Sequence, residues 1–154
     1  MNGNALKLRR VIEKHTIIGL DTAPFIYFIE EVAPYADVLD PVFGLLEDHA
    51  VRAVTSTVTV AEILTKPFSD KNFSLADEIK FTLKSFASLA VVSIDEKLAE
   101  AAALIRARYT IRLPDALQVA AAIQGQATLF LTNDKRVKKV DAVEVLVLSD
   151  FLPN

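Results

Sequence analysis

The sequence predicts an α/β fold with a mainly parallel sheet of about five strands and helices on both faces. Two observations lead to this prediction. Short apolar, β-branched runs of strand length recur along the chain, and longer segments with apolar residues at helical spacing separate them. The chain has 154 residues, a length that suits one ordinary domain, so we expect residues 1–154 to form a single domain.

The first quarter of the chain is expected to contain one strand and two helices. Residues 1–14 are polar and basic, and we expect a basic N-terminal arm or a fraying helix there. Thr16–Leu20 is a short apolar run that predicts a buried strand. Asp21-Thr22 then opens a helix that ends before Pro34, and a second helix is expected over about 35–49.

The middle of the chain repeats this alternation of strand and helix. Val51–Thr55 is apolar and β-branched, which favours a second strand, and Ser56 can cap the helix that follows it. Residues 73–88 place apolar side chains at helical spacing, which predicts another helix. We expect Leu89–Ile94 to be the third strand.

The last third is expected to add two helices and two strands. Asp95 can cap a long alanine-rich helix that reaches about Arg108. Pro114 begins a helix that continues to Ile123, since proline is favoured in a first turn. Residues 128–131 and 143–148 are apolar runs expected to form the fourth and fifth strands.

The composition excludes several kinds of site. There is no cysteine, which excludes disulfides and thiolate chemistry, and the only histidines are His15 and His49. The net charge of −3 offers no protein-wide basic field to gather nucleic acid. Charged residues interrupt the N-terminal segment, and Gln124-Gly125-Gln126 divides the longest uncharged run, so we expect no signal peptide, no membrane span and a cytoplasmic location.

Four acidic residues occupy positions that parallel sheets bring together. Asp21 and Asp134 directly follow the first and fourth predicted strands, at the edge where such sheets form their sites. Asp115 lies at the start of a predicted helix, where the helix dipole favours a carboxylate. Glu62 lies in the helix after the second strand among apolar neighbours, a setting in which an acid needs a partner or a metal.

Four carboxylates at one place repel one another, so the cluster makes physical sense when a divalent cation binds there. Oxygen ligands without sulfur or imidazole select Mg²⁺ or Mn²⁺, and a metal-bound water can attack phosphorus. In the metal-free protein we expect some of these acids to have raised pKa values. Taken singly, Asp21, Asp115 and Asp134 could equally be capping residues, and the hypothesis rests on their combination with Glu62.

At these positions the sequence resembles the PIN-domain family, specifically its VapC-type toxin branch. The resemblance spans about residues 16–151 and consists of four blocks in the family order. The blocks are Ile18-Gly19-Leu20-Asp21-Thr22, Thr55-Ser56 through Ala61-Glu62-Ile63-Leu64, Leu113-Pro114-Asp115-Ala116-Leu117, and Leu131-Thr132-Asn133-Asp134. Each block alone is weak, whereas all four in order are specific.

The resemblance implies a three-layer α/β/α fold and Mg²⁺- or Mn²⁺-dependent cleavage of RNA. It also implies a small antitoxin partner and a homodimer. It assigns the metal to Asp21, Glu62, Asp115 and Asp134, and places Thr132 at a position where the family often has a hydroxyl near the metal.

Basic residues near these motifs are candidates for binding RNA phosphates. The nearest are Arg112, Lys135 and Arg136, and further candidates are Arg108, Lys138 and Lys139. For Lys138 and Lys139 the alternative is a solvated surface, and Arg112 could equally be an ion-pair partner of Asp115.

Other functional classes fit less well. A haloacid-dehalogenase phosphatase needs a second acid two residues after Asp21, where this chain has Ala23. A receiver domain needs an acidic pair, and nucleotide-binding loops need glycine-rich turns, but the chain has only four scattered glycines. The alternative that stays open is a PIN-like RNA- or protein-binding regulatory module without turnover.

A hydrophobic content of 52% also suggests an interface with an antitoxin or a second subunit. We expect Phe25, Tyr27 and Phe28, together with the helix at 35–49, to contribute to it, with the protein core as the alternative location for these aromatic residues.

Overall fold

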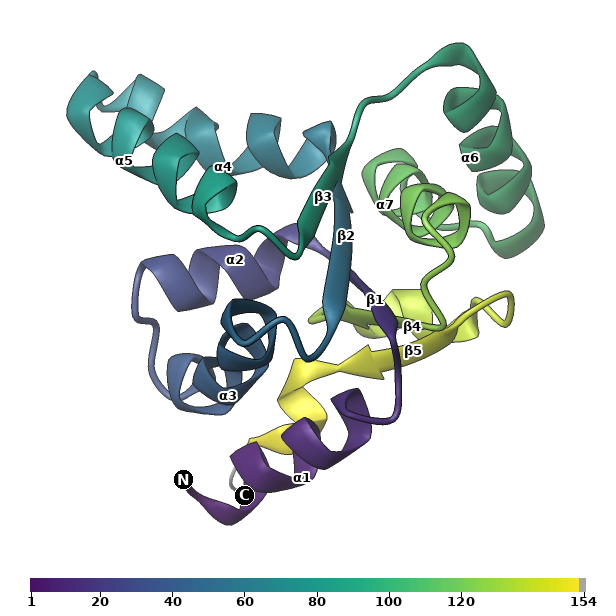
Figure 1. Cartoon of the computed structure of the whole chain (residues 1–154). Coiled ribbons are helices and arrows are strands. Elements are labelled where there is room, and N and C mark those ends of the chain that lie inside the picture. Colours follow the sequence, from purple (N-terminus) through teal and green to yellow (C-terminus); the bar gives the residue numbers. More distant parts are fainter. Residues whose placement is uncertain (153–154) are drawn as a thin grey trace.

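A computed structural model describes residues 1–152, and within them a five-stranded, fully parallel sheet forms the centre of the molecule (Figure 1). The strands are β1 (Ile17–Leu20), β2 (Arg52–Ser56), β3 (Leu89–Val92), β4 (Leu129–Thr132) and β5 (Glu144–Val147). Their order across the sheet is β3-β2-β1-β4-β5, and each neighbouring pair is parallel. The predicted number and direction of strands are confirmed.

Helices cover both faces of this sheet. They are α1 (Gly3–Ile12), α2 (Thr22–Ile29), α3 (Tyr35–Glu47), α4 (Thr57–Ser69), α5 (Phe73–Ser85), α6 (Glu96–Tyr109) and α7 (Leu113–Gln124), with short 3-10 helices η1 (Lys135–Lys139) and η2 (Leu148–Phe151). One apolar core joins the sheet to α1–α5, and a second joins it to α6, α7 and η1. The chain therefore has the three layers that the resemblance implied.

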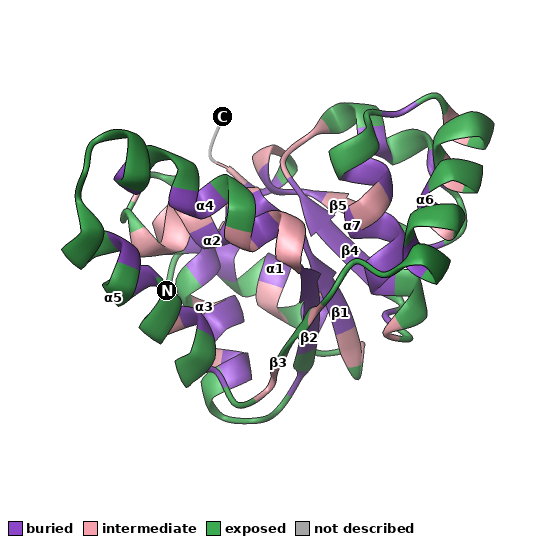
Figure 2. Cartoon of the chain, turned by 90° about the horizontal axis from the view of Figure 1, so that it is seen from above, coloured by how far each residue is buried: buried purple, intermediate pink, exposed green. Residues whose placement is uncertain are grey.

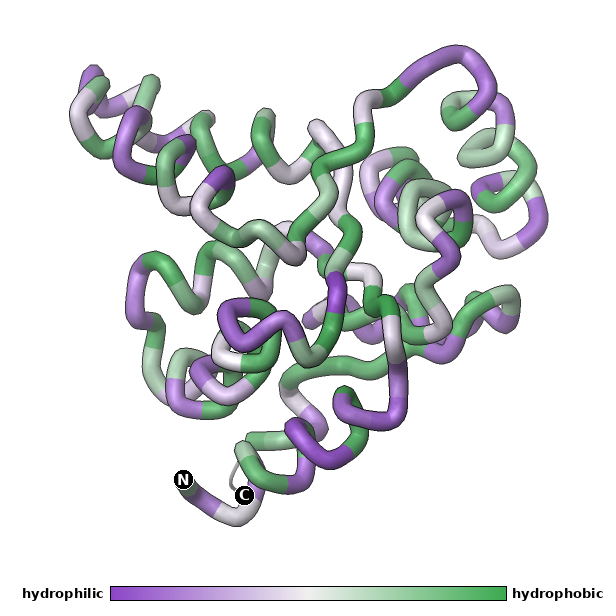
Figure 3. Tube along the Cα trace, in the orientation of Figure 1, coloured by the Kyte–Doolittle hydropathy of each residue, from purple (hydrophilic) through white to green (hydrophobic). Residues whose placement is uncertain are grey.

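The strands serve both cores because successive side chains of a strand point to opposite faces. In β4, Leu129 and Leu131 belong to the core beside α1–α5, whereas Phe130 belongs to the core beside α6 and α7. Figure 3 shows the strands as apolar segments and the surrounding helices as alternating polar and apolar ones. None of the helices in residues 1–152 combines the length and the apolar composition that crossing a membrane would require.

The N-terminal residues form a packed helix, so the expectation of an arm or a fraying helix over 1–14 is wrong. Asn2 caps α1 by accepting a hydrogen bond from the Ala5 N–H at 2.7 Å. Ala5, Leu8 and Ile12 are fully buried, and α1 packs against α3. These residues recur every three or four positions, so they form one apolar face between the basic residues.

Helix α5 differs from its prediction in extent and in orientation. It ends at Ser85 instead of continuing to residue 88, and the next residue, Phe86, has extended backbone and a buried side chain. Phe73 and Phe81 are two of the apolar side chains whose helical spacing predicted this helix, but they are 62% and 75% exposed. The pair α4 and α5 lies at one side of the molecule (Figure 2), so only one face of α5 meets the core.

Of the residues expected at an interface, Phe25 lies in the core, whereas Tyr27 and Phe28 are partly buried and pack against it. Phe25 is fully buried and contacts Phe43 edge to face, with ring centroids 5.6 Å apart. Phe28 stacks on Phe43 at 4.0 Å, and Tyr27 stacks on Tyr35 at 4.2 Å. These contacts join α2 to α3.

The strand order reverses between β1 and β4, at the centre of the sheet. From β1 the chain builds outward through β2 and β3 on one side, and β4 and β5 lie on the other. The Asp21 N–H extends the pairing beyond the end of β1, donating to the Leu131 carbonyl at 3.0 Å. Crevices at such reversals, outside the carboxyl ends of the strands, are where open α/β sheets bind ligands.

Candidate active site

A pocket of about 450 Å³ opens at this edge of the sheet, and the main predicted site residues line it, whereas the further candidates Arg108, Lys138 and Lys139 do not. The predicted residues are Asp21, Glu62, Arg112, Asp115, Thr132, Asp134, Lys135 and Arg136. The prediction that the four acids share one pocket is confirmed. They come from four separate segments: the ends of β1 and β4, and the helices α4 and α7.

Asp21 is a buried acid whose pKa is raised. It caps α2 by accepting from the Thr22 N–H at 2.8 Å, and the Thr132 hydroxyl donates to it at 2.7 Å. The side chain is 7% exposed, and this burial raises the pKa of Asp21 to about 6. The charges of Asp115 and Glu62 add smaller increases. A raised pKa was expected from the sequence, but its main cause is loss of solvation, not mutual repulsion.

Asp115 is paired with an arginine from the same turn. It lies in the first turn of α7 and is 5% exposed. The Arg112 Nε donates to Asp115 Oδ2 at 2.9 Å, and Arg112 Nη2 donates to Oδ1 at 3.3 Å. The alternative role considered for Arg112, an ion-pair partner of Asp115, is therefore present in the structure.

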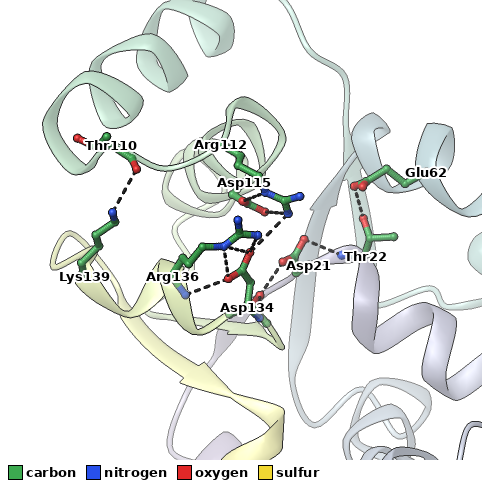
Figure 4. Close-up of polar contacts among 10 residues, drawn as sticks. Asp21, Thr22, Glu62, Thr110, Arg112, Asp115, Asp134, Arg136 and Lys139 are labelled. Atoms are coloured by element: carbon green, nitrogen blue, oxygen red, sulfur yellow. Dashed lines mark hydrogen bonds and ion pairs between the residues drawn. The ribbon is translucent and has the colours of Figure 1, made fainter.

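Asp134 is held by the arginine two residues later. It accepts from the Arg136 backbone N–H at 2.9 Å and from Arg136 Nη2 at 2.6 Å. Arg112 Nη2 approaches the same carboxylate at 3.5 Å, so Asp134 lies between two guanidinium groups (Figure 4). The hydrogen bonds from Arg136 hold the pKa of Asp134 below its ordinary value, against the opposing effect of burial.

Glu62 is exposed, so the interpretation that it lies in an apolar setting is wrong. Its apolar neighbours Ile63 and Leu64 turn toward the core, whereas Glu62 projects from the other side of α4. The Thr22 hydroxyl donates to Glu62 Oε1 at 2.8 Å, which joins α4 to the start of α2 (Figure 4). Glu62 therefore does have a partner, a neutral one.

Two residues that form hydrogen bonds around the site were not singled out in the sequence. Asn133 holds the loop after β4, because its amide nitrogen donates to the hydroxyls of Tyr27 and Tyr35 at 3.1 and 3.2 Å. Gln118 is 1% exposed and bonds to residues of β2, α2 and α4. The available signal for Gln118 was a lone amide inside an otherwise apolar helical segment.

The pocket offers carboxylate and hydroxyl oxygens, the donor types that Mg²⁺ and Mn²⁺ prefer. In residues 1–152, no three acidic or histidine side chains are gathered closely enough to hold a metal ion. Arg112 and Arg136 engage Asp115 and Asp134. For a cation to bind all four acids, these guanidinium groups would have to release some of the carboxylate oxygens that they now bind.

The fold has counterparts among known proteins. The family model of the PIN domain matches residues 18–143. No curated protein is significantly similar to the chain in sequence.

Several solved structures share the fold. The VapBC2 complex of Rickettsia felis bound to a promoter DNA fragment has a chain that is 18% identical, with a TM-score of 0.63, covering 85% of this chain and 98% of its own. VapBC-1 of nontypeable Haemophilus influenzae has one that is 19% identical, with a TM-score of 0.64 and coverages of 86% and 98%. FitAB bound to the IR36 DNA fragment has one that is 24% identical, with a TM-score of 0.64 and coverages of 90% and 97%. At these identities the likeness shows the fold.

Proposed function

The chain belongs to the PIN domain family, whose model covers residues 18–143, and on this premise we propose that it is a metal-dependent endoribonuclease. One observation carries the proposal. Four acids from separate segments line a single pocket where the strand order reverses, with Arg112, Lys135 and Arg136 around it. Oxygen ligands beside basic groups suit the hydrolysis of a phosphodiester.

The residues of the pocket fit a divalent cation. Asp21 is more than nine-tenths buried and accepts hydrogen bonds only from the neutral Thr22 N–H and Thr132 hydroxyl, and burial of an anion without a compensating positive charge is costly. We assign the metal, Mg²⁺ or Mn²⁺, to Asp21, Glu62, Asp115 and Asp134. When bound, it would polarise the scissile phosphate and lower the pKa of an attacking water.

The residues of the chain itself orient these acids. Thr132 donates to Asp21 at 2.7 Å and accepts from the Asp134 N–H at 3.1 Å, so one buried hydroxyl joins two of the acids. The Thr22 N–H and hydroxyl hold Asp21 and Glu62 respectively. Such bonds fix the rotamers of ligand side chains before a metal or substrate arrives.

Arg112, Lys135 and Arg136 are assigned to the RNA backbone. The side chains of Arg112 and Arg136 are 57% and 62% exposed, so their guanidinium groups can reach a phosphate at the mouth of the pocket. A guanidinium binds phosphate with the same forked geometry that it uses for carboxylate. Contacts of this kind position RNA without reading its sequence.

We also propose a small antitoxin as partner, a homodimer, and action in the cytoplasm. The support for a partner is that the solved relatives are VapBC complexes and another that is described as a toxin-antitoxin complex. Because Phe25 lies in the core, the exposed Phe68, Phe73 and Phe81 of α4 and α5 are further candidates for an apolar contact surface. Co-expression with the neighbouring gene and size-exclusion chromatography tests both assemblies.

The function is tested by incubating the purified chain with a panel of RNAs in Mg²⁺, Mn²⁺ or EDTA. We expect cleavage with metal that leaves a 5′-phosphate and a 3′-hydroxyl, none in EDTA, and none with Asp21→Asn. Asp77→Asn is the matched control, since Asp77 is an exposed acid on α5 outside the pocket. RNA that binds without cleavage in any metal would favour the alternative, a regulatory module without turnover.

A further inference from the structure

A group of buried polar side chains lies beneath the pocket. In residues 1–152, eight polar or charged residues are buried, and Asp21, Asp115 and Thr132 belong directly to the acid site. The remaining five are Thr22, Thr55, Ser56, Thr59 and Gln118, and hydrogen bonds connect them to one another. Buried polar networks are costly unless every member is hydrogen-bonded. We therefore asked what this network does for the acids above it.

Gln118 is the centre of this network. Its Oε1 accepts from the Ser56 hydroxyl at 2.7 Å. Its Nε2 donates to Thr59 Oγ1 at 2.7 Å and to Thr22 Oγ1 at 3.2 Å. An amide nitrogen has two protons and accepts no bond, so both of these threonine oxygens act as acceptors toward it.

The direction of these bonds determines where the Thr22 proton can go. Since Thr22 Oγ1 accepts from Gln118, its own proton is available to Glu62 Oε1, which lies at 2.8 Å. The Thr59 hydroxyl also forms a hydrogen bond with Thr55 Oγ1 at 2.8 Å, in which either oxygen can be the donor. The network thus presents a hydroxyl donor to the Glu62 carboxylate.

The same amide connects the three helices that carry or follow the acids. Gln118 lies on α7, three residues after Asp115 and on the same side of the helix. It bonds to Thr22, whose N–H donates to the capping carboxylate of Asp21, and to Thr59 on the helix of Glu62. A single side chain therefore sets the relative placement of α2, α4 and α7.

We propose that Gln118 is a positioning residue that holds Glu62, through Thr22, in the orientation needed to bind a divalent cation. Glu62 is long, exposed and otherwise free to occupy several rotamers, so without this bond it would lose rotamer freedom on binding metal. The inference rests on the proposed function, because it assumes that Glu62 is a metal ligand. Residues that orient a ligand typically contribute about 10–100-fold to metal affinity.

The test is isothermal titration of the full chain with Mn²⁺ alone, for wild type, Gln118→Met, Thr22→Val and the double variant. Methionine keeps the length of glutamine without hydrogen bonds, and valine keeps the shape of threonine and its N–H bond to Asp21. We expect each single variant to weaken Mn²⁺ binding about tenfold or more. The double variant should bind Mn²⁺ as well as the more impaired single variant does, because both substitutions break the same connection. Thr22→Ser, which keeps the hydroxyl, should bind Mn²⁺ as wild type does.

Val119→Ala is the matched control. Val119 is fully buried beside Gln118 on α7, in the core away from the pocket, so its truncation lowers the melting temperature and leaves Mn²⁺ affinity unchanged. If Gln118→Met does not fold, Gln118→Glu serves instead: its carboxylate would accept the Thr22 proton and also weaken Mn²⁺ binding.

Two results would overturn the inference. In the first, a protein with Gln118 substituted has a lower melting temperature but binds Mn²⁺ as wild type does, which would make Gln118 a purely structural residue. In the second, the effects of Gln118→Met and Thr22→Val multiply, which would show that they act separately. A wild-type protein that binds no Mn²⁺ would instead refute the proposed metal site, and the inference with it.

Discussion

The substitution Asp21→Asn should make the metal-free protein insensitive to a pH change that destabilises wild type. Burial raises the pKa of Asp21 from 3.8 to about 6, so the folded state favours its protonated form. This change in the pKa of Asp21 corresponds to about 3 kcal/mol. This stability is fully present below about pH 4 and is lost as pH rises through about 6, because the fold must then hold a buried anion.

Asparagine removes the titration and retains most of the local bonds. Its oxygen can accept from the Thr22 N–H, as the aspartate does now at 2.8 Å. Its nitrogen faces the Thr132 hydroxyl, which loses its acceptor, at a cost of about 1 kcal/mol. That cost is the same at every pH, so the informative quantity is how the stability difference between the two proteins changes with pH.

Urea unfolding in EDTA from pH 4 to pH 8 measures this difference. We expect the free energy of unfolding of wild type to fall by about 2 kcal/mol relative to Asp21→Asn across this range, with most of the change between pH 4 and pH 6. Asp77→Asn, on an exposed acid, should run parallel to wild type. A wild-type minus Asp21→Asn difference that stays constant within about 0.5 kcal/mol would refute the assignment of a buried, costly carboxylate.

Three further predictions concern neighbouring parts of the molecule. Thr132→Val removes a hydrogen bond that lowers the pKa of Asp21, so the Asp21 titration, followed by carbon NMR, should move above pH 6; an unchanged titration would contradict the contact. Gly19→Ala would bring a Cβ within 2.5 Å of Ala122 Cβ, so it should lower the free energy of unfolding, measured by chemical denaturation, by about 1–3 kcal/mol. Gly44→Ala is the control: a Cβ there meets open space inside α3, so it should raise the free energy of unfolding by about 0.5–1 kcal/mol. Arg136→Gln should weaken RNA binding and lower its dependence on salt by about one phosphate contact; an unchanged salt slope would exclude Arg136 from the RNA interface.

Local signals in the sequence predicted the elements well. Ser56 caps α4 by accepting from the Val58 N–H at 3.2 Å, and Asp95 caps α6 by accepting from the Leu98 N–H at 2.8 Å. Capping depends on residues three positions apart or fewer, so the sequence alone contains the relevant information. The errors concern long-range packing. Whether α1 packs, and which face of α5 meets solvent, depends on the position of α3 and α4, which no local pattern encodes.

In the candidate site, too, features that depend on local sequence could be predicted and features that depend on long-range packing could not. Its four acids could be located because the carboxyl ends of parallel strands meet at one edge, whatever their order. Their partners could not, because the approach of Thr22 to Glu62 and of Thr132 to Asp21 depends on β1 lying between β2 and β4. The exposure of Glu62 was misjudged for a related reason: apolar neighbours in sequence on a helix point in different directions.

The pocket is electrostatically asymmetric, and this decides which acid responds most to a cation. Asp115 and Asp134 have arginine partners, whereas Asp21 and Glu62 receive bonds from neutral groups. The charge of Asp21 is therefore the one that the protein compensates least, in keeping with its raised pKa. A divalent cation would relieve the largest electrostatic cost at Asp21, while at Asp115 and Asp134 it would compete with guanidinium groups. For this reason substitution of Asp21 separates metal binding from ion pairing more cleanly than substitution of Asp115, where loss of a ligand and release of Arg112 would occur together.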